Sequence, residues 1–232
     1  AEELASAGLV DVESEYAYKG YCLLRQKAHS ATAVHPDLLL CLTTSGSTGS
    51  PKFVRISESN LRSNTEAIAE YLSINQQERP ITSLPLYYSF GMSVLNSNLL
   101  KGATILLTDK AIVQREFWEF LKKEQATSIA GVPYTYETLK AFRFFRMNLP
   151  YLRTMIQAGG KLNADIVKQY AEYAQANGKR FFVMYGQTEA SPRISYLPAD
   201  RAIDKYESIG IAVPGGRMAV MNEEGKELNR SY

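Results

Sequence analysis

The sequence is poor in cysteine and histidine, carries almost no net charge and has no long apolar run. Its two cysteines are too few for a disulfide framework, and Cys41 lies in an apolar segment typical of a small buried side chain. Twenty-six basic and 24 acidic residues leave a formal charge of +2, so no bulk attraction draws nucleic acid or an anionic membrane. No segment approaches the roughly 20 apolar residues of a membrane-spanning helix. The first ten residues lack the basic and apolar regions of a signal peptide, so we expect a cytoplasmic protein.

From Asp37 onward, apolar strand-like runs alternate with helical segments. The first run, residues 38–43, is continuously apolar, as in a strand covered on both faces. We expect helices at 58–72, 90–100, 114–124, 133–147 and 164–176, and further strands at 81–84, 103–107, 127–130, 153–157 and 180–184. This alternation predicts an α/β fold, a largely parallel β-sheet with helices on both faces. After Ser208 the pattern changes to short strands, including 216–221, which favours the start of a small β subdomain.

A loop rich in serine, glycine and threonine follows the first apolar run. Its residues of interest are Thr44, Ser45, Gly46, Ser47, Thr48, Gly49 and Lys52. Glycines let backbone N–H groups turn toward an anion, the hydroxyls add donors, and Lys52 adds positive charge. The composition therefore favours a phosphate-binding loop, although the Walker A pattern cannot be placed on it. A flexible Ser/Gly linker is the alternative.

Two further motifs follow predicted strands. They are Ala158-Gly159-Gly160-Lys161 and Met184-Tyr185-Gly186-Gln187-Thr188-Glu189. In an open α/β sheet, ligands collect outside the carboxyl ends of the strands. Tyr185 offers a ring face to a base, Thr188 a hydroxyl to a phosphate, and Glu189 an oxygen ligand to Mg²⁺. Either motif alone is also compatible with an ordinary turn.

Together these motifs resemble those of the adenylate-forming enzymes, which include acyl-CoA synthetases, firefly-type luciferases and the adenylation domains of peptide synthetases. The family's phosphate loop, T-S-G-[ST]-T-G-x-P-K-G, matches residues 44–52 in order, with Phe53 where glycine is usual. The family's Y-G-x-T-E motif matches residues 185–189. Weaker signatures fall in register at 85–91, 131–135 and 208–215, with Tyr88 where many members carry histidine.

The resemblance implies ATP-dependent activation of a small-molecule carboxylic acid. An acyl adenylate forms, pyrophosphate leaves, and a thiol takes the acyl group, from coenzyme A or from the phosphopantetheine arm of an acyl carrier protein. Catalytic roles fall by resemblance on Lys52, Thr188 and Glu189, with Glu189 as the Mg²⁺ ligand. The nucleotide-binding positions by resemblance are Thr44, Ser45, Gly46, Ser47, Thr48, Gly49, Lys52, Gly159, Gly160, Lys161, Tyr185, Gly186, Gln187 and Thr188.

The resemblance also suggests a substrate class. Peptide-synthetase adenylation domains carry, at the position of Gly91, an aspartate that binds the substrate ammonium group, so an α-amino acid is not expected here. The positions that the resemblance places around the acyl group are Gly91, Met92, Leu95, Gly131, Ile156, Ala158 and Met184. Because all are small or apolar, we expect an uncharged acyl or aryl group, with Gly91 and Gly131 giving room for its chain. Arg193 is expected to be solvated or structural, and a contact with a distal carboxylate of the substrate is the alternative.

Family members are much longer than this sequence. By resemblance, residues 1–36 are a truncated leading segment of the N-terminal lobe, 37–207 the α/β AMP-binding core, and 208–232 the start of a β subdomain. A ribose-binding aspartate in a T-G-D motif and a C-terminal domain with a catalytic lysine would follow Tyr232. We therefore expect an expressed fragment or a degenerate paralogue with little activity of its own. A non-catalytic nucleotide-binding or interaction module that keeps the fold is the alternative.

Overall fold

The computed structural model describes residues 12–18, 21–26, 33–44 and 52–228. The chain divides into two compact units, residues 1–36 and 37–232. In the first unit, β1 (Val12–Tyr18) pairs antiparallel with β2 (Tyr21–Gln26). Within the described ranges, no helix combines the length and apolar character needed to cross a membrane.

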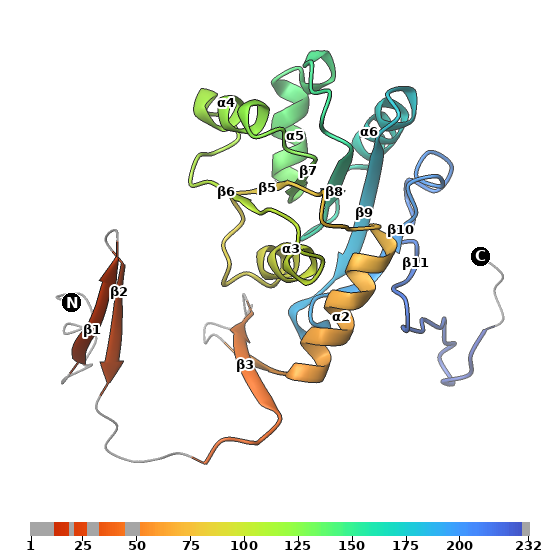
Figure 1. Ribbon diagram of the computed structural model, residues 1–232. Helices are drawn as coiled ribbons and strands as arrows, with labels where there is room; N and C mark the ends of the chain where they lie inside the picture. The colour runs from red at the N-terminus through yellow and green to blue at the C-terminus, as the bar shows by residue number, and fades with distance from the viewer. Residues whose placement is uncertain (1–11, 19–20, 27–32, 45–51, 229–232) are drawn as a thin grey trace. The chain divides into compact units, whose positions relative to one another are not determined.

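A seven-stranded sheet forms the centre of the second unit (Figure 1). Its strand order is β11-β10-β9-β8-β7-β5-β6, in which β5 to β9 run parallel while β10 and β11 are antiparallel. The strands are β5 (Pro80–Thr82), β6 (Leu106–Leu107), β7 (Ser128–Gly131), β8 (Thr154–Gln157), β9 (Arg180–Gly186), β10 (Arg193–Leu197) and β11 (Ile211–Ala212). The helices are α2 (Glu58–Tyr71), α3 (Ser89–Leu100), α4 (Arg115–Lys123), α5 (Pro133–Ala141) and α6 (Ala164–Ala176). The predicted α/β class with a largely parallel sheet is confirmed.

Each face of the sheet has its own apolar core, because neighbouring residues of a strand point to opposite sides. Met155 and Phe181 belong to the core that α4, α5 and α6 cover. The next residues, Ile156 and Phe182, belong to the core that α2 and α3 cover. The helices therefore lie on both faces, as the alternating sequence pattern predicts.

The predicted doubly covered strand at residues 38–43 is wrong. β3 (Leu38–Thr43) pairs antiparallel with β4 (Phe53–Ser57) in a two-stranded sheet separate from the central one. Its side chains alternate between more buried and exposed, and Leu39 is 51% exposed. Cys41, expected to be buried, is exposed for the same reason. An apolar run does not by itself distinguish a strand of a covered sheet from a strand of a hairpin.

Other elements also differ from the sequence expectation. The helix expected over 133–147 ends at Ala141, because Arg143 adopts a left-handed conformation (φ 57°) before a short 3₁₀ turn, η1 (Phe144–Arg146). The antiparallel strand β10 was not foreseen from the sequence. Residues 216–221 form no strand, although Met221 makes an isolated bridge with Glu227.

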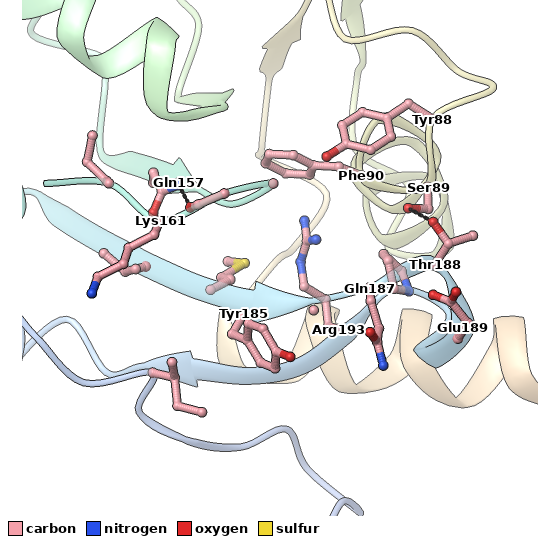
Figure 2. Close-up of a pocket in the computed structure, with 18 of the residues that line it drawn as sticks. Tyr88, Ser89, Phe90, Gln157, Lys161, Tyr185, Gln187, Thr188, Glu189 and Arg193 are labelled. Atoms are coloured by element: carbon pink, nitrogen blue, oxygen red, sulfur yellow. Dashed lines mark hydrogen bonds between the residues drawn. The ribbon is translucent and has the colours of Figure 1, made fainter. Parts of the chain in front are cut away.

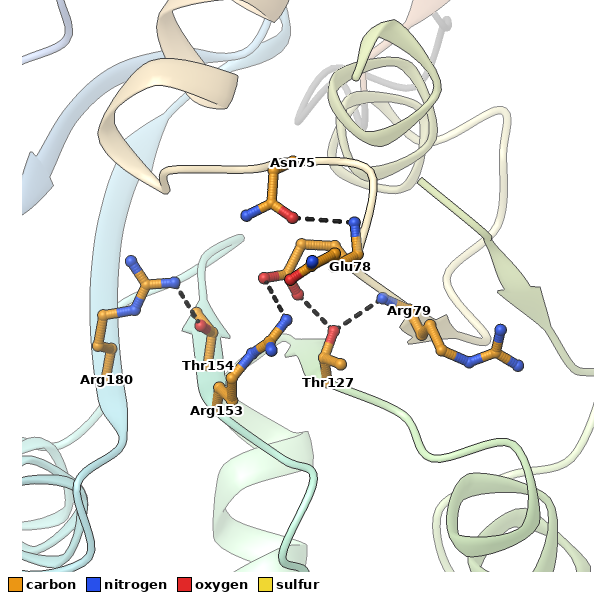
Figure 3. Close-up of polar contacts among 8 residues, drawn as sticks. Asn75, Glu78, Arg79, Thr127, Arg153, Thr154 and Arg180 are labelled. Carbon is orange, nitrogen blue, oxygen red and sulfur yellow. Dashed lines mark hydrogen bonds and ion pairs between the residues drawn. The ribbon is translucent and has the colours of Figure 1, made fainter. Parts of the chain in front are cut away.

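A polar network joins the amino ends of three neighbouring parallel strands (Figure 3). The buried Glu78 carboxylate accepts hydrogen bonds from the Thr127 hydroxyl and from the Arg153 guanidinium, the latter at 2.8 Å. The Thr127 hydroxyl oxygen also accepts from the backbone N–H of Arg79 at 2.8 Å. Arg79, Thr127 and Arg153 directly precede β5, β7 and β8. The opposite, carboxyl ends of β5 and β8 lead into segments that line the candidate site.

Candidate active site

The carboxyl ends of β8 and β9 and the amino end of α3 border a cavity of about 1100 Å³ (Figure 2). This volume is at the upper end of the range for small-molecule pockets. α3 begins at Ser89 after a turn in which the Tyr88 N–H donates to the Pro85 carbonyl at 3.1 Å. The sheet edge at which ligands are expected is therefore hollow, and residues of all three motifs line it.

The Tyr185–Glu189 motif forms the wall at the end of β9. Gly186 ends the strand, and an added Cβ there would overlap the carbonyl oxygen of Pro192, so only glycine fits this close approach. A short 3₁₀ turn, η2 (Thr188–Ala190), follows. Tyr185 (44% exposed), Gln187, Thr188 and Glu189 all line the cavity. The motif thus presents a ring, a hydroxyl and a carboxylate to one space.

Thr188 meets the opposite wall through Ser89. The two hydroxyl oxygens lie 3.4 Å apart, although the residues are 99 positions apart in the chain (Figure 2). Ser89 is buried at the first position of α3 and lines the cavity. Two hydroxyls at this spacing can donate together to the oxygens of one anionic group.

The Gly159-Gly160-Lys161 segment lines the cavity after β8. Gly159 has φ +80°, and an added Cβ would lie 2.5 Å from the Tyr88 hydroxyl, so the position requires glycine. The Gly160 carbonyl accepts a hydrogen bond from Gln157 Nε2 at 2.9 Å, which holds the turn open toward the cavity. Lys161 is exposed at the rim.

The predicted phosphate loop is described only at its two ends. Ser45, Gly46, Ser47, Thr48 and Gly49 lie outside the described residues, so their assignment stays a prediction. Thr44 lines the cavity, and its backbone N–H donates to the carbonyl of the exposed Lys52 at 3.1 Å. The antiparallel pairing of β3 with β4 therefore holds the two ends of the loop together beside the cavity.

Arg193, expected to be solvated or structural, is not solvated. It is 5% exposed and lines the cavity from the start of β10. Its guanidinium lies over the Phe90 ring, 4.3 Å from the centroid, and donates to Ser93 Oγ at 3.2 Å (Figure 2). Burial lowers the pKa of this guanidinium, and the nearby Tyr71 and Tyr88 side chains partly offset that effect.

Of the seven positions assigned to the acyl group, only Met184 lines the large cavity. Met92 and Ile156 border small voids of about 10 Å³ each. Ala158 is buried within the apolar core on the α2–α3 face. Leu95 is partly buried on α3 and does not line the large cavity. The structure therefore does not bring these seven side chains together around one space.

The prediction that Gly91 and Gly131 give room for an acyl chain is wrong. A Cβ on Gly91 would overlap the carbonyl oxygen of Pro85. A Cβ on Gly131 would lie 2.5 Å from Thr135 Cγ2. Both glycines permit close packing of neighbouring segments and leave no free volume beside them.

Gln157 is a cavity residue that sequence reasoning missed. It is fully buried, lines the cavity, and its Oε1 has no hydrogen-bond partner among the described residues. A polar side chain at the carboxyl end of the strand β8 is the available signal. Ser89 is a second cavity residue that sequence reasoning missed, although it lies in the family signature at residues 85–91.

Glu189 is suited to bind a Mg²⁺ ion whose other ligands are phosphate oxygens and waters. Within the described residues, no cluster of three or more His, Cys, Asp or Glu side chains converges. Glu189 is exposed on η2 beside Thr188. Mg²⁺ in nucleotide sites takes one or two protein carboxylates together with phosphate oxygens and waters. The Glu189 carboxylate, beside the Thr188–Ser89 hydroxyl pair that could bind a phosphate group, fits that arrangement.

A family model for the AMP-binding enzymes matches residues 3–231, and the chain belongs to this family. It is 29% identical over 201 residues to feruloyl-CoA synthase of an Amycolatopsis species, which covers 82% of this chain and 40% of that protein. It is 30% identical over 193 residues to the mitochondrial medium-chain acyl-CoA ligase of Homo sapiens. The match covers 80% of this chain and 31% of that protein. The resemblance to acyl-CoA synthetases is confirmed.

Solved structures share the fold. The o-succinylbenzoate coenzyme A synthetase of Bacillus subtilis, in complex with ATP and magnesium ion, gives a TM-score of 0.70 at 24% identity over 82% of this chain and 38% of that one. The N-terminal domain of FACL13 from Mycobacterium tuberculosis gives a TM-score of 0.73 at 20% identity. The match covers 88% of this chain and 50% of that one. The chain thus spans 31–50% of the length of these relatives.

Proposed function

We propose that this chain is the nucleotide-binding part of an enzyme that activates a carboxylic acid with ATP and passes the acyl group to a thiol. The observation that carries the proposal is the convergence of Thr188, Glu189, Tyr185 and the Gly159-Gly160 turn on one cavity. Family membership and the acyl-CoA ligases among the relatives support the same reaction class.

The reaction consists of two nucleophilic displacement steps. In the first, a carboxylate oxygen attacks the α-phosphorus of ATP, the bond to the bridging oxygen breaks, and pyrophosphate leaves. In the second, a thiol sulfur attacks the acyl carbon, loses its proton, and AMP leaves. Both steps depend on positioning and on neutralising phosphate charge more than on a covalent contribution from the protein.

The cavity residues match these needs. Thr188 and Ser89 supply two hydroxyl donors for the α-phosphate. Lys52, which is exposed and does not line the cavity wall, is assigned by the family resemblance to the outer phosphates. Tyr185 offers its ring to adenine, and the Gly159-Gly160 turn allows a flat base to approach the backbone. Glu189 would hold Mg²⁺, which shields the phosphate charge when bound.

The thiol acceptor is proposed to be coenzyme A. The feruloyl-CoA synthase and the medium-chain acyl-CoA ligase support this choice by their names. A D-alanine–D-alanyl carrier protein ligase of Bacillus licheniformis, 28% identical over 199 residues, keeps a carrier protein as the alternative acceptor. The three relatives use different acids, so relatedness alone does not select a substrate.

Isothermal titration with Mg·ATP tests the nucleotide part of this proposal. The chain should bind Mg·ATP, and Lys52→Ala should weaken ATP binding about tenfold while leaving adenosine binding unchanged, since the lysine is assigned to phosphate. Lys140→Ala, which removes an exposed lysine outside the cavity wall, is the matched control. Absence of ATP binding would overturn the proposal. Binding without adenylate formation in a longer form of the protein would favour the non-catalytic module.

A further inference from the structure

The guanidinium of Arg193 has only neutral neighbours in the described part of the chain. Its polar contacts are the Ser93 hydroxyl at 3.2 Å and the Tyr71 hydroxyl, both uncharged, and its Nε has no hydrogen-bond partner among the described residues. None of the ion pairs among the described residues includes it, whereas Arg79 and Arg153 each pair with a glutamate. Stacking on Phe90 compensates a buried cation only in part, because a cation–π contact is weaker than a desolvated ion pair.

The backbone that carries Arg193 is held firmly in place. The Asn64 side chain on α2 donates to the Arg193 carbonyl at 2.8 Å and accepts from the Arg193 N–H at 3.3 Å. The side chain is confined between the Phe90 ring and Ser93. A cation fixed in this way is preorganised, so a ligand that pairs with it does not have to order it first.

An anionic partner for Arg193 can arrive only from the large cavity. The void behind the guanidinium, bordered by Ser97, Asn98 and Ile156, measures about 10 Å³. That volume is no more than one water molecule requires. The cavity of about 1100 Å³ on the other side has ample room.

We propose that the acid substrate is a dicarboxylic acid. Arg193 binds one of its carboxylates, and the other carboxylate reacts with ATP. This inference rests on the proposed function and revises the expectation of an uncharged acyl group. Ser89, at the proposed phosphate position, and Ser93, beside Arg193, are about one helical turn apart on α3. A turn rises about 5.4 Å, so the proposed phosphate position and the proposed position of the second carboxylate lie on the order of one helical turn apart.

Binding measurements on the unaltered chain test the substrate class directly. With saturating AMP, straight-chain dicarboxylates from succinate to suberate are titrated, together with the monomethyl ester of the diacid that binds best. The ester keeps the chain and one carboxylate but lacks the second charge. The diacid should bind at least about tenfold more tightly than its ester, as for a charge-assisted contact. Equal binding of the two would overturn the inference, and this comparison needs no variant.

Variants assign the preference to Arg193. Arg193→Met should reduce the diacid-to-ester ratio to about one, and Arg193→Lys should restore part of it, because lysine keeps the charge without the planar fork. Arg180→Met removes a half-buried arginine that lies over Phe182 at the other end of β9, and it should leave the ratio unchanged. A preserved ratio in a folded Arg193→Met variant would assign the preference to another group.

The outcome is separable from that of the proposed function. Mg·ATP binding is measured on the same samples, and Arg193→Met should bind ATP as the unaltered chain does. If ATP binds and no diacid is preferred, the dicarboxylate inference alone fails. If the Arg193→Met variant loses ATP affinity while diacid and ester remain equal in the unaltered chain, Arg193 pairs with nucleotide phosphate and the inference is again wrong.

Discussion

Thr188 and Ser89 bring two uncharged donors to one point of the cavity wall from distant parts of the chain. Their hydroxyls are close enough to bind the same anionic group, and neither adds a charge that would need a counter-ion. Arg193 shows the opposite case, since its charge is buried at 5% exposure without a carboxylate partner among the described residues. The difference suggests that the cavity separates a phosphate region from an acid-binding region.

Thr188→Val tests the phosphate region, since valine keeps the shape of threonine and removes the hydroxyl. We expect AMP to bind about tenfold more weakly, because a hydrogen bond to a charged group is lost. Adenosine should bind as before, because it has no phosphate. Isothermal titration with both ligands measures the difference, and Thr138→Val on α5, outside the cavity wall, is the control. A parallel loss of adenosine affinity would place Thr188 elsewhere than at the phosphate.

At the scale of elements, the sequence predicts best where local signals agree with packing. The helix expected over 164–176 has those limits in the structure, because Asn163 caps it by accepting from the Asp165 N–H and a stop signal, Asn177-Gly178, follows. β3 was assigned to the wrong environment, since its apolar residues pack within a hairpin. β10 was missed because its start follows a Ser191-Pro192 step that indicates a turn.

The site follows the same division. Positions within the Tyr185–Glu189 motif were located from the sequence because a strand end fixes where its loop lies. Gly91 and Gly131 were misjudged, since the sequence does not show which neighbouring atoms fill the space beside a glycine. The burial of Arg193 depends on Phe90 and Ser93, which lie about a hundred positions away and cannot be paired with it from one sequence.

The network around Glu78 should stabilise the ends of the sheet elements that it joins (Figure 3). Glu78→Ala leaves the Thr127 hydroxyl and the Arg153 guanidinium without their acceptor. We expect a loss of about 2 kcal/mol in the free energy of unfolding, less than for a fully buried pair because Arg153 is 46% exposed and can turn to water. Denaturant unfolding measures it.

Glu58→Ala is the control for the Glu78 variant. It removes the carboxylate of the Glu58–Arg62 pair, whose side chains are 68% and 64% exposed, and should cause no measurable change. Equal effects of the two substitutions would show that the Glu78 network contributes no more than an exposed ion pair.

At the scale of the whole molecule, the unit of residues 37–232 contains the cavity, although the chain is much shorter than its relatives. The chain spans 40% of the feruloyl-CoA synthase and 31% of the medium-chain acyl-CoA ligase that it matches. The cavity is bordered by β8, β9, α3 and the segment around Ser208, all within this unit. Under the proposed function, nucleotide would therefore contact groups within this unit.

The 232-residue chain alone should bind nucleotide yet turn over very slowly. The family resemblance places a ribose-binding aspartate and a catalytic lysine outside the motifs of this sequence, and each charge missing from the transition state costs about 10²–10³ in rate. We therefore expect ATP–pyrophosphate exchange with the preferred acid to be at least about a hundredfold slower than in a full-length relative such as the feruloyl-CoA synthase measured in parallel. Addition in trans of a relative's segment that carries the aspartate and the lysine should raise the exchange rate without tightening AMP binding by the same factor. Exchange at the rate of the full-length relative would show that the residues of this chain suffice for adenylate formation.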